Sequence, residues 1–126
     1  MRAFWPGMLT LVIRQQPSLA WPLTARKIAL RMPLHPIALQ LAADVGPIAF
    51  TTANRAGMPV ARAAATAVEQ FEDDVAVYLD AGLSADLGRS SVVDVTSHDP
   101  VLLREGATTA QQIRGVCPTL EVPDVD

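Results

Sequence analysis

The sequence has 126 residues, a common length for one domain that buries a sizeable hydrophobic core. Half of the residues are hydrophobic and 18% are charged, which excludes a wholly disordered chain. The formal net charge of -3 argues against a generally basic nucleic-acid-binding protein, although it leaves room for a local basic patch.

The cysteine, the histidines and the apolar segments indicate the cellular compartment and whether a metal site or a membrane-spanning helix is expected. The one cysteine, Cys117, rules out an internal disulfide and predicts a reducing compartment, so we expect a cytoplasmic protein. His35 and His98 are far apart and have no acidic or cysteine cluster at metal-ligand spacing, so we expect no metal site. No apolar stretch approaches the roughly 18 residues that a membrane-spanning helix needs, so we expect no membrane association.

The first third of the chain predicts two strands and a helix. Residues 9–14 are rich in β-branched side chains and predict a strand. Residues 15–25 contain two prolines and predict a loop, after which residues 27–32 predict a second strand. Pro36 suits the first turn of a helix that continues to about Val45 and ends at Gly46.

The middle of the chain predicts a further strand, helix and strand. Residues 47–51 (PIAFT) are almost entirely apolar and predict a short buried strand. A polar loop over residues 52–59 follows. Residues 61–71 are rich in alanine and predict a helix, and residues 75–79 predict another strand.

The last third predicts a hairpin, a short helix and a tail. Residues 91–96 and 101–104 predict two strands joined by a turn at Ser97–Pro100, and Thr109 is placed to cap a short helix. The tail over residues 118–126 holds two prolines and three acidic residues, which predicts a flexible end. Strands interleaved with helices predict an α/β fold, with an open twisted mixed sheet and flanking helices.

Four segments resemble, in the same order, motifs of one protein family. They read FWPGMLTLV (residues 4–12), ALRMPLHP (residues 29–36), GPIAFTTANRAGMP (residues 46–59), and LDAG, SSVVD and LLREGA (residues 79–82, 90–94 and 102–107). The chain resembles the C-terminal part of the YrdC-like threonylcarbamoyl-AMP synthases. It departs from their motifs where Met8 replaces a proline, Thr52 a serine, Ser91 a threonine and Ala81 a glycine.

The resemblance begins part-way along the family domain. The N-terminal segment of the family, with its TDTxYGL strand and its lysine- and arginine-bearing phosphate motif, has no counterpart here. We therefore expect a partial YrdC-like domain over residues 1–117, followed by the flexible tail over residues 118–126. A fragment and a natural truncated relative both remain open, and we expect weak activity or none from these residues alone.

The resemblance implies an L-threonylcarbamoyladenylate synthase, a nucleotidyltransferase that serves the modification of tRNA with threonylcarbamoyladenosine. Its substrates would be ATP, L-threonine and bicarbonate, its second product pyrophosphate, and Mg²⁺ is expected with the ATP. Such chemistry depends on positioning and on neutralising phosphate charge, which calls for cations and directed donors. No catalytic residue is singled out.

Motif matching predicts the residues of the site. Those expected to bind ATP are Thr52, Val60, Arg104, Asn54 and Arg31, and those expected to bind threonine are Ser90 and Phe50. For Val60 and Phe50 the contact would come from the main chain.

Each prediction has a plainer alternative. Arg104 would otherwise form a surface ion pair with Glu105 or Asp94. Arg31 could bind a phosphate or the threonine carboxylate, and it would otherwise lie in solvent at the end of its strand. The loop at Thr52–Asn54 would otherwise satisfy its own backbone in a turn.

Other functions share the same motifs. One is a non-catalytic module that binds a nucleotide or double-stranded RNA, although the acidic balance weighs against RNA. Another is a carbamoyl-transfer domain like that of hydrogenase-maturation proteins. A sheet that stops part-way also exposes an edge strand, which predicts self-association.

Overall fold

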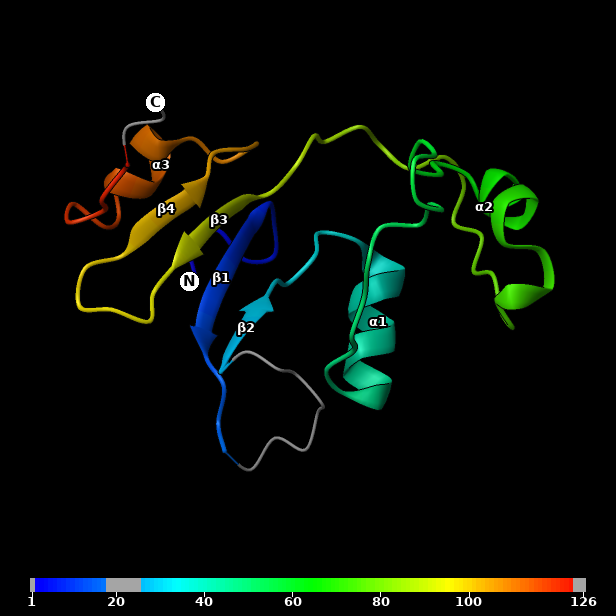
Figure 1. Ribbon diagram of the computed structural model, residues 1–126, viewed down its shortest axis with the longest axis horizontal. Helices are drawn as coiled ribbons and strands as arrows, with labels where there is room; N and C mark the ends of the chain where they lie inside the picture. Colours follow the sequence, from blue (N-terminus) through cyan, green and yellow to red (C-terminus); the bar gives the residue numbers. More distant parts are fainter. Residues whose placement is uncertain (1, 18–25, 124–126) are drawn as a thin grey trace. The chain divides into compact units, whose positions relative to one another are not determined.

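The structure, a computed structural model, describes residues 2–17 and 26–123 (Figure 1). The predicted loop over residues 15–25 therefore lies mostly outside the described residues, as do the last three residues of the predicted tail. The chain divides into two compact units, one formed by Met1–Leu39 with Leu87–Asp126 and the other by Gln40–Asp86.

The first unit contains the predicted mixed sheet. Its order is β2-β1-β3-β4, with β1 antiparallel to β2, parallel to β3, and β3 antiparallel to β4. The strands are β1 (Leu9–Arg14), β2 (Lys27–Leu30), β3 (Ser91–Asp94) and β4 (Val101–Arg104). The predictions for β1 and β4 are confirmed at both ends, whereas β2 and β3 each stop two residues before the predicted end.

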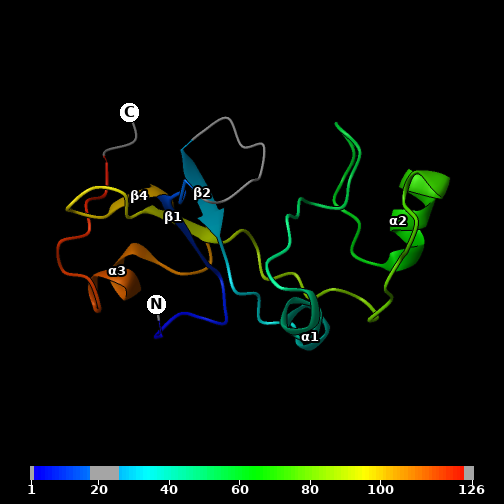
Figure 2. The same cartoon turned by 90° about the horizontal axis from the view of Figure 1, so that it is seen from below.

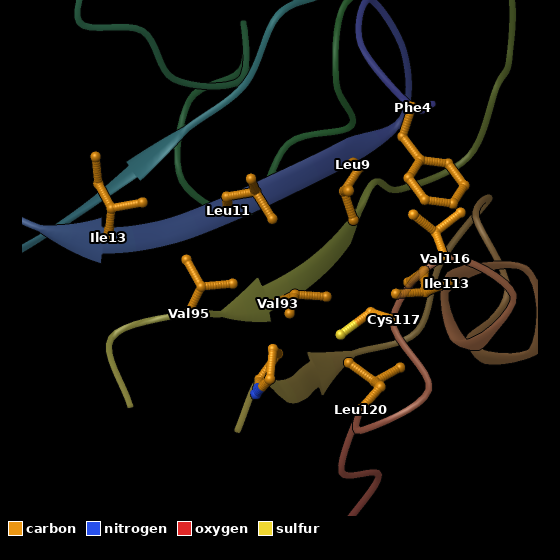
Figure 3. A pocket seen from close by; sticks show the side chains of 11 residues that line it. Phe4, Leu9, Leu11, Ile13, Val93, Val95, Ile113, Val116, Cys117 and Leu120 are labelled. Atoms are coloured by element: carbon orange, nitrogen blue, oxygen red, sulfur yellow. The ribbon is translucent and has the colours of Figure 1, made fainter. Parts of the chain in front are cut away.

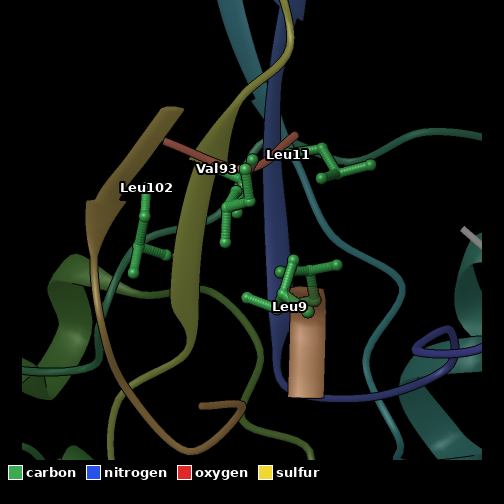
Figure 4. Packing of buried hydrophobic residues seen from close by; sticks show 6 residues of the cluster. Leu9, Leu11, Val93 and Leu102 are labelled. Atoms are coloured by element: carbon green, nitrogen blue, oxygen red, sulfur yellow. The ribbon is translucent and has the colours of Figure 1, made fainter. Parts of the chain in front are cut away.

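One face of the sheet forms the hydrophobic core, because side chains alternate between the two faces of a strand. Figure 4 shows Leu9 and Leu11 of β1 beside Val93 of β3 and Leu102 of β4. The helix α3 (Ala110–Arg114) adds Ile113 to this cluster. In Figure 2, α3 and the N-terminal segment lie on the same side of the sheet. Each large apolar side chain buried here contributes about 1.5–3 kcal/mol.

A cavity of about 260 Å³ opens on this core face (Figure 3). Its lining is apolar apart from the thiol of Cys117, and it holds no charged side chain. A phosphate or carboxylate placed there would lose its hydration without gaining a cation. The cavity is therefore unsuited to the anionic ligands that the sequence predicts.

The C-terminal tail is ordered for part of its length, which corrects the prediction of a free end from Pro118. Leu120 is 3% exposed and belongs to the core cluster. Glu121 pairs with the outer edge of β4, since Leu102 N donates to Glu121 O at 2.8 Å and Glu121 N donates to Pro100 O at 2.8 Å. The proline and acidic residues of the tail predicted a flexible end. The burial of Leu120 in the core and the pairing of Glu121 with β4 hold this part of the tail in place instead.

The cap of α3 is confirmed. Thr109 Oγ1 accepts from Gln112 N at 3.2 Å, and Thr109 N donates to Gln112 Oε1 at 2.8 Å, which completes a capping box.

An ion pair joins β2 to β3 on the face opposite the core. Lys27 Nζ donates to Asp94 Oδ2 at 2.7 Å, and Thr96 N donates to Asp94 Oδ1 at 2.8 Å. These hydrogen bonds, that from Lys27 first, lower the pKa of Asp94 from its ordinary 3.8 to about 2. Because the pKa is lower in the folded chain, the stabilisation is present above about pH 4 and disappears as the pH falls toward 2.

We expect this ion pair to make the chain acid-sensitive. The free energy of unfolding of the wild type should fall more steeply between pH 4 and pH 2 than that of Asp94→Asn, measured by urea unfolding. Equal slopes for the two proteins would show that Asp94 does not carry the effect.

The regular elements of the second unit are helices, of which the first begins in the other unit. The helix α1 (Pro36–Val45) ends where predicted, at Gly46, whose φ of 84° suits glycine. The helix α2 (Ala64–Phe71) begins three residues later than predicted, because Ala63 has an extended backbone at the N-cap position. The short 3-10 helix η1 (Glu72–Asp74) follows it. No described helix is long and apolar enough to cross a membrane.

Two predicted strands, at residues 47–51 and 75–79, are absent from the described residues, and this prediction was wrong. Their apolar side chains are exposed instead, 71% for Phe50 and 69% for Val77. A strand forms only when its backbone pairs with another strand, and neither segment has such a partner among the described residues. Sequence pattern alone detected the apolar character of these segments and not the missing partner.

Candidate functional site

The polar face of the sheet brings several predicted site residues into one row. Thr10 pairs with Val92, and Val92 pairs in turn with Arg104. The β1–β2 register pairs Leu11 with Leu30, so its continuation sets Arg31 beside Thr10. Cross-strand neighbours share a face. Arg31 and Arg104 thus lie near opposite edges of one face, three strand spacings or roughly 14 Å apart.

Arg104 holds Ser90 directly. Arg104 Nε and Nη2 donate to Ser90 O at 3.1 and 2.8 Å, and Nη2 also lies 3.3 Å from Ser90 Oγ. An arginine has five N–H donors, and these bonds use Nε and Nη2. The two N–H groups of Nη1 have no partner in the part of the chain that the structure describes.

The charge of Arg104 is not neutralised within the described chain, so the alternative of a surface ion pair does not apply. Glu105 Oε1 accepts from Ala110 N at 2.8 Å, and Asp94 is bound to Lys27. Neither carboxylate lies within 4.0 Å of the Arg104 guanidinium. A guanidinium fixed by a carbonyl but free of acids suits an anionic ligand.

Arg31 has a similar environment. Its Nε donates to Gly7 O at 2.9 Å, and its Nη2 lies 2.7 Å from Met8 Sδ. Partial burial lowers the pKa of Arg31, although an arginine stays charged at neutral pH. No described carboxylate pairs with it. Arg31 and Arg104 are thus two positive charges on the polar face that no described carboxylate neutralises.

A hydroxyl pair lies between them. Thr10 Oγ1 and Ser90 Oγ are 2.9 Å apart, and Ser90 is 8% exposed. The sequence singled out Ser90 but missed Thr10, because nothing in the chain order indicates that residues 80 positions apart share a hydrogen bond.

The backbone at Ser90 is supported by Gly106. A Cβ atom at position 106 would collide with Arg89 O and lie 2.7 Å from Ser90 C. Gly106 N also donates to Ser91 Oγ at 2.9 Å. Only glycine therefore fits between β4 and the start of β3 without moving Ser90.

We expect Gly106→Ala to destabilise the chain by about 1–3 kcal/mol and to displace Ser90, because the added methyl group meets backbone atoms that cannot rotate away. Gly115→Ala is the matched control, since its Cβ would approach only Gln112 O closely, at 3.3 Å, and its φ of -60° is helical. Thermal unfolding of both variants measures the difference. Equal losses would refute the role of close packing at position 106.

The remaining predicted residues belong to the second unit. Asn54 Nδ2 donates to Arg55 O and Met58 O, both at 3.1 Å, and Asn54 N donates to Thr52 O at 3.0 Å. The backbone groups of this loop thus form hydrogen bonds within the loop itself, as expected if the segment were simply a turn. Asn54 Oδ1 is nevertheless buried and has no hydrogen-bond partner among the described residues. Thr52, Val60 and Phe50 are exposed.

Two side chains that the sequence did not single out tie this loop to α2. Gln70 Nε2 donates to Pro59 O at 3.0 Å, and Gln70 Oε1 accepts from Arg55 N at 3.0 Å. The guanidinium of Arg55 also binds Asp74 and lies 5.6 Å from the centre of the Phe71 ring. The loop after the apolar PIAFT segment is thus held on a helix.

The predicted site residues therefore fall into two sets. The structure brings Ser90 and Arg104 into contact and sets Arg31 on the same sheet face, all in the first unit. Phe50, Thr52, Asn54 and Val60 belong to the second unit. That both sets contact one ligand stays a prediction.

No group of three or more histidine, cysteine or acidic side chains that could hold a metal ion occurs among residues 2–17 and 26–123.

The known proteins that are similar to this chain belong to one family. The Sua5/YciO/YrdC family model, described as telomere recombination, matches residues 1–106. A Mycobacterium tuberculosis protein, named provisionally as a threonylcarbamoyl-AMP synthase, is 47% identical over 117 residues, which are 91% of this chain and 54% of that protein. The threonylcarbamoyl-AMP synthase of Bacillus subtilis is 36% identical over 126 residues, which are 97% of this chain and 36% of that enzyme.

Solved structures of the same family also match the fold of this chain. The crystal structure of Pyrococcus abyssi Sua5 complexed with L-threonine matches with a TM-score of 0.85 and 34% identity, over 97% of this chain and 37% of that one. A double variant of the same protein matches with a TM-score of 0.86. The chain thus spans about half the length of its mycobacterial relative and about a third of the Bacillus and Pyrococcus proteins.

Proposed function

The chain belongs to the Sua5/YciO/YrdC family, and from that membership we propose that it takes part in the synthesis of L-threonylcarbamoyladenylate. The reaction joins ATP, L-threonine and bicarbonate and releases pyrophosphate. The relatives from bacteria, archaea and yeast are named threonylcarbamoyl-AMP synthases, which favours this reaction over a non-catalytic module.

The main structural support for the proposal is the guanidinium of Arg104, which binds Ser90 and pairs with no described carboxylate. In this reaction a carbamate oxygen attacks the α-phosphate of ATP, and negative charge grows on the phosphate oxygens. A fixed cation that faces no carboxylate of its own stabilises that charge. We assign phosphate binding to Arg104 and Arg31, and further nucleotide contacts to Thr52, Asn54 and Val60.

L-threonine is assigned to Ser90 and to the main chain at Phe50. The support is the Pyrococcus relative, which was solved with L-threonine. The hydroxyl of Ser90 is a donor next to a positive charge, which suits the carboxylate of an amino acid.

The remaining partners follow from the same reaction. We expect bicarbonate as the third substrate, and Mg²⁺ to arrive with ATP, held mainly by its phosphates and by water, as is common for this ion. We further propose a cytoplasmic location and self-association through the outer edge of β2, which has no partner strand among the described strands. RNA binding belongs to the less favoured non-catalytic alternative.

Substrate binding and turnover test the proposal together. Calorimetry should detect binding of ATP and of L-threonine to the chain, and any pyrophosphate released from ATP should require both L-threonine and bicarbonate. A chain that bound neither substrate, or that released pyrophosphate without L-threonine, would contradict the proposed function.

A further inference from the structure

Thr10 lies next to the proposed substrate site, but the proposed function assigns it no substrate contact. It is in β1, on the polar face of the sheet, and its hydroxyl is 2.9 Å from that of Ser90. The contact joins two segments 80 residues apart. It is independent of the ladder hydrogen bonds, which use backbone atoms alone.

The donors and acceptors in this cluster can be counted. Arg104 can only donate, so its Nη2 uses one acceptor position on Ser90 Oγ. Thr10 and Ser90 hold one hydroxyl proton each, and one of these two protons forms the bond between them. Whichever hydroxyl donates, the pair keeps a single O–H group for a ligand.

We infer that Thr10 is a positioning residue that donates to Ser90 Oγ and so leaves the Ser90 O–H group directed toward the carboxylate of bound L-threonine, an inference that rests on the proposed function. A carboxylate only accepts hydrogen bonds and therefore matches the one remaining O–H group. Without Thr10, the Ser90 hydroxyl would be free to turn and to donate elsewhere, for example to the carbonyl oxygens of its own segment.

The test compares two variants of the 126-residue chain. Thr10→Val keeps the shape and the strand propensity of threonine but removes the hydroxyl, whereas Thr10→Ser keeps the hydroxyl and removes the methyl group. By calorimetry, Thr10→Val should bind L-threonine about threefold to tenfold more weakly than the wild type, the effect of one hydrogen bond. Thr10→Ser should stay within about threefold of the wild type.

Two results would overturn the inference. One is a Thr10→Val variant that binds L-threonine as tightly as the wild type. The other is a Thr10→Ser variant that loses as much affinity as Thr10→Val, since the methyl group would then be what matters. Binding of ATP to the same variants serves as the control for folding, because Thr10 is not assigned to the nucleotide.

A ligand-free measurement separates this inference from the proposed function. In the wild type, the NMR couplings between the Hα and Hβ protons of Ser90 should report one side-chain rotamer, and in Thr10→Val they should report averaging over several. Unchanged couplings would overturn the orienting role, whatever the chain binds. Absence of L-threonine binding by the wild type would instead contradict the proposed function.

Discussion

Replacing Arg104 with alanine is expected to weaken ATP binding by one to two orders of magnitude, about 1.5–3 kcal/mol for a hydrogen bond to a charged group. The loss arises because the variant lacks a guanidinium that no described carboxylate neutralises. Isothermal titration calorimetry with ATP measures the change.

Arg14→Ala is the matched control for this experiment. Arg14 lies on the same sheet face at the far end of β1, and its Nε also donates to a carbonyl, Thr96 O at 3.1 Å. Its loss should leave ATP affinity within about twofold of the wild type, because it lies outside the proposed site. Arg104→Lys should be intermediate, since it keeps the charge but not the forked geometry. An unchanged dissociation constant for Arg104→Ala would remove Arg104 from the site.

Replacing Leu102 with alanine is expected to destabilise the first unit by about 2–5 kcal/mol, because the change leaves a void in the core. Leu102 is 5% exposed and packs in the cluster with Leu9 and Val93. The described core has only six buried hydrophobic residues, so one void is a large fraction of it. Folded proteins of this size have a total stability of about 5–15 kcal/mol, and the variant could be largely unfolded at 37 °C.

Leu103→Ala is the control, since it makes the same chemical change at the next position of the same strand. Leu103 is 56% exposed and occupies the register irregularity between β3 and β4. Its replacement should change the free energy of unfolding by no more than about 0.5 kcal/mol. Urea unfolding of both variants gives the comparison. Similar losses at positions 102 and 103 would contradict the assignment of the core face.

The sheet of the first unit was largely predictable, because its strands carry strong local signals. Alternating apolar residues and β-branched side chains mark β1, and the turn before Val101 marks the hairpin of β3 and β4. Caps were also predictable, since Gly46 and Thr109 act through their immediate neighbours. Local chemistry determines these features.

Features that depend on distant partners were predicted less well. The PIAFT segment has the composition of a buried strand but lacks a pairing strand among the described residues. Leu120 was assigned to a free tail because its proline and acidic neighbours gave the stronger local signal. Both errors arise where tertiary contacts, present or missing, outweigh local pattern.

The candidate site shows the same division. Arg104 and Ser90 were found through motifs, and the structure adds that they touch. Thr10 and Gln70 were missed, because their importance comes from hydrogen bonds to residues 80 and 11 positions away. A strand threonine and a helix glutamine are ordinary residues until their partners are known.

The central claim is the proposal that each unit contributes contacts to the nucleotide. Titrating the ¹⁵N-labelled chain with ATP and following its amide signals by NMR tests this most directly. We predict that the signals of Arg31 and Arg104 in the first unit, and those of Thr52 and Asn54 in the second, shift along one binding curve with a single dissociation constant. Shifts confined to one unit, or two different dissociation constants, would contradict the claim.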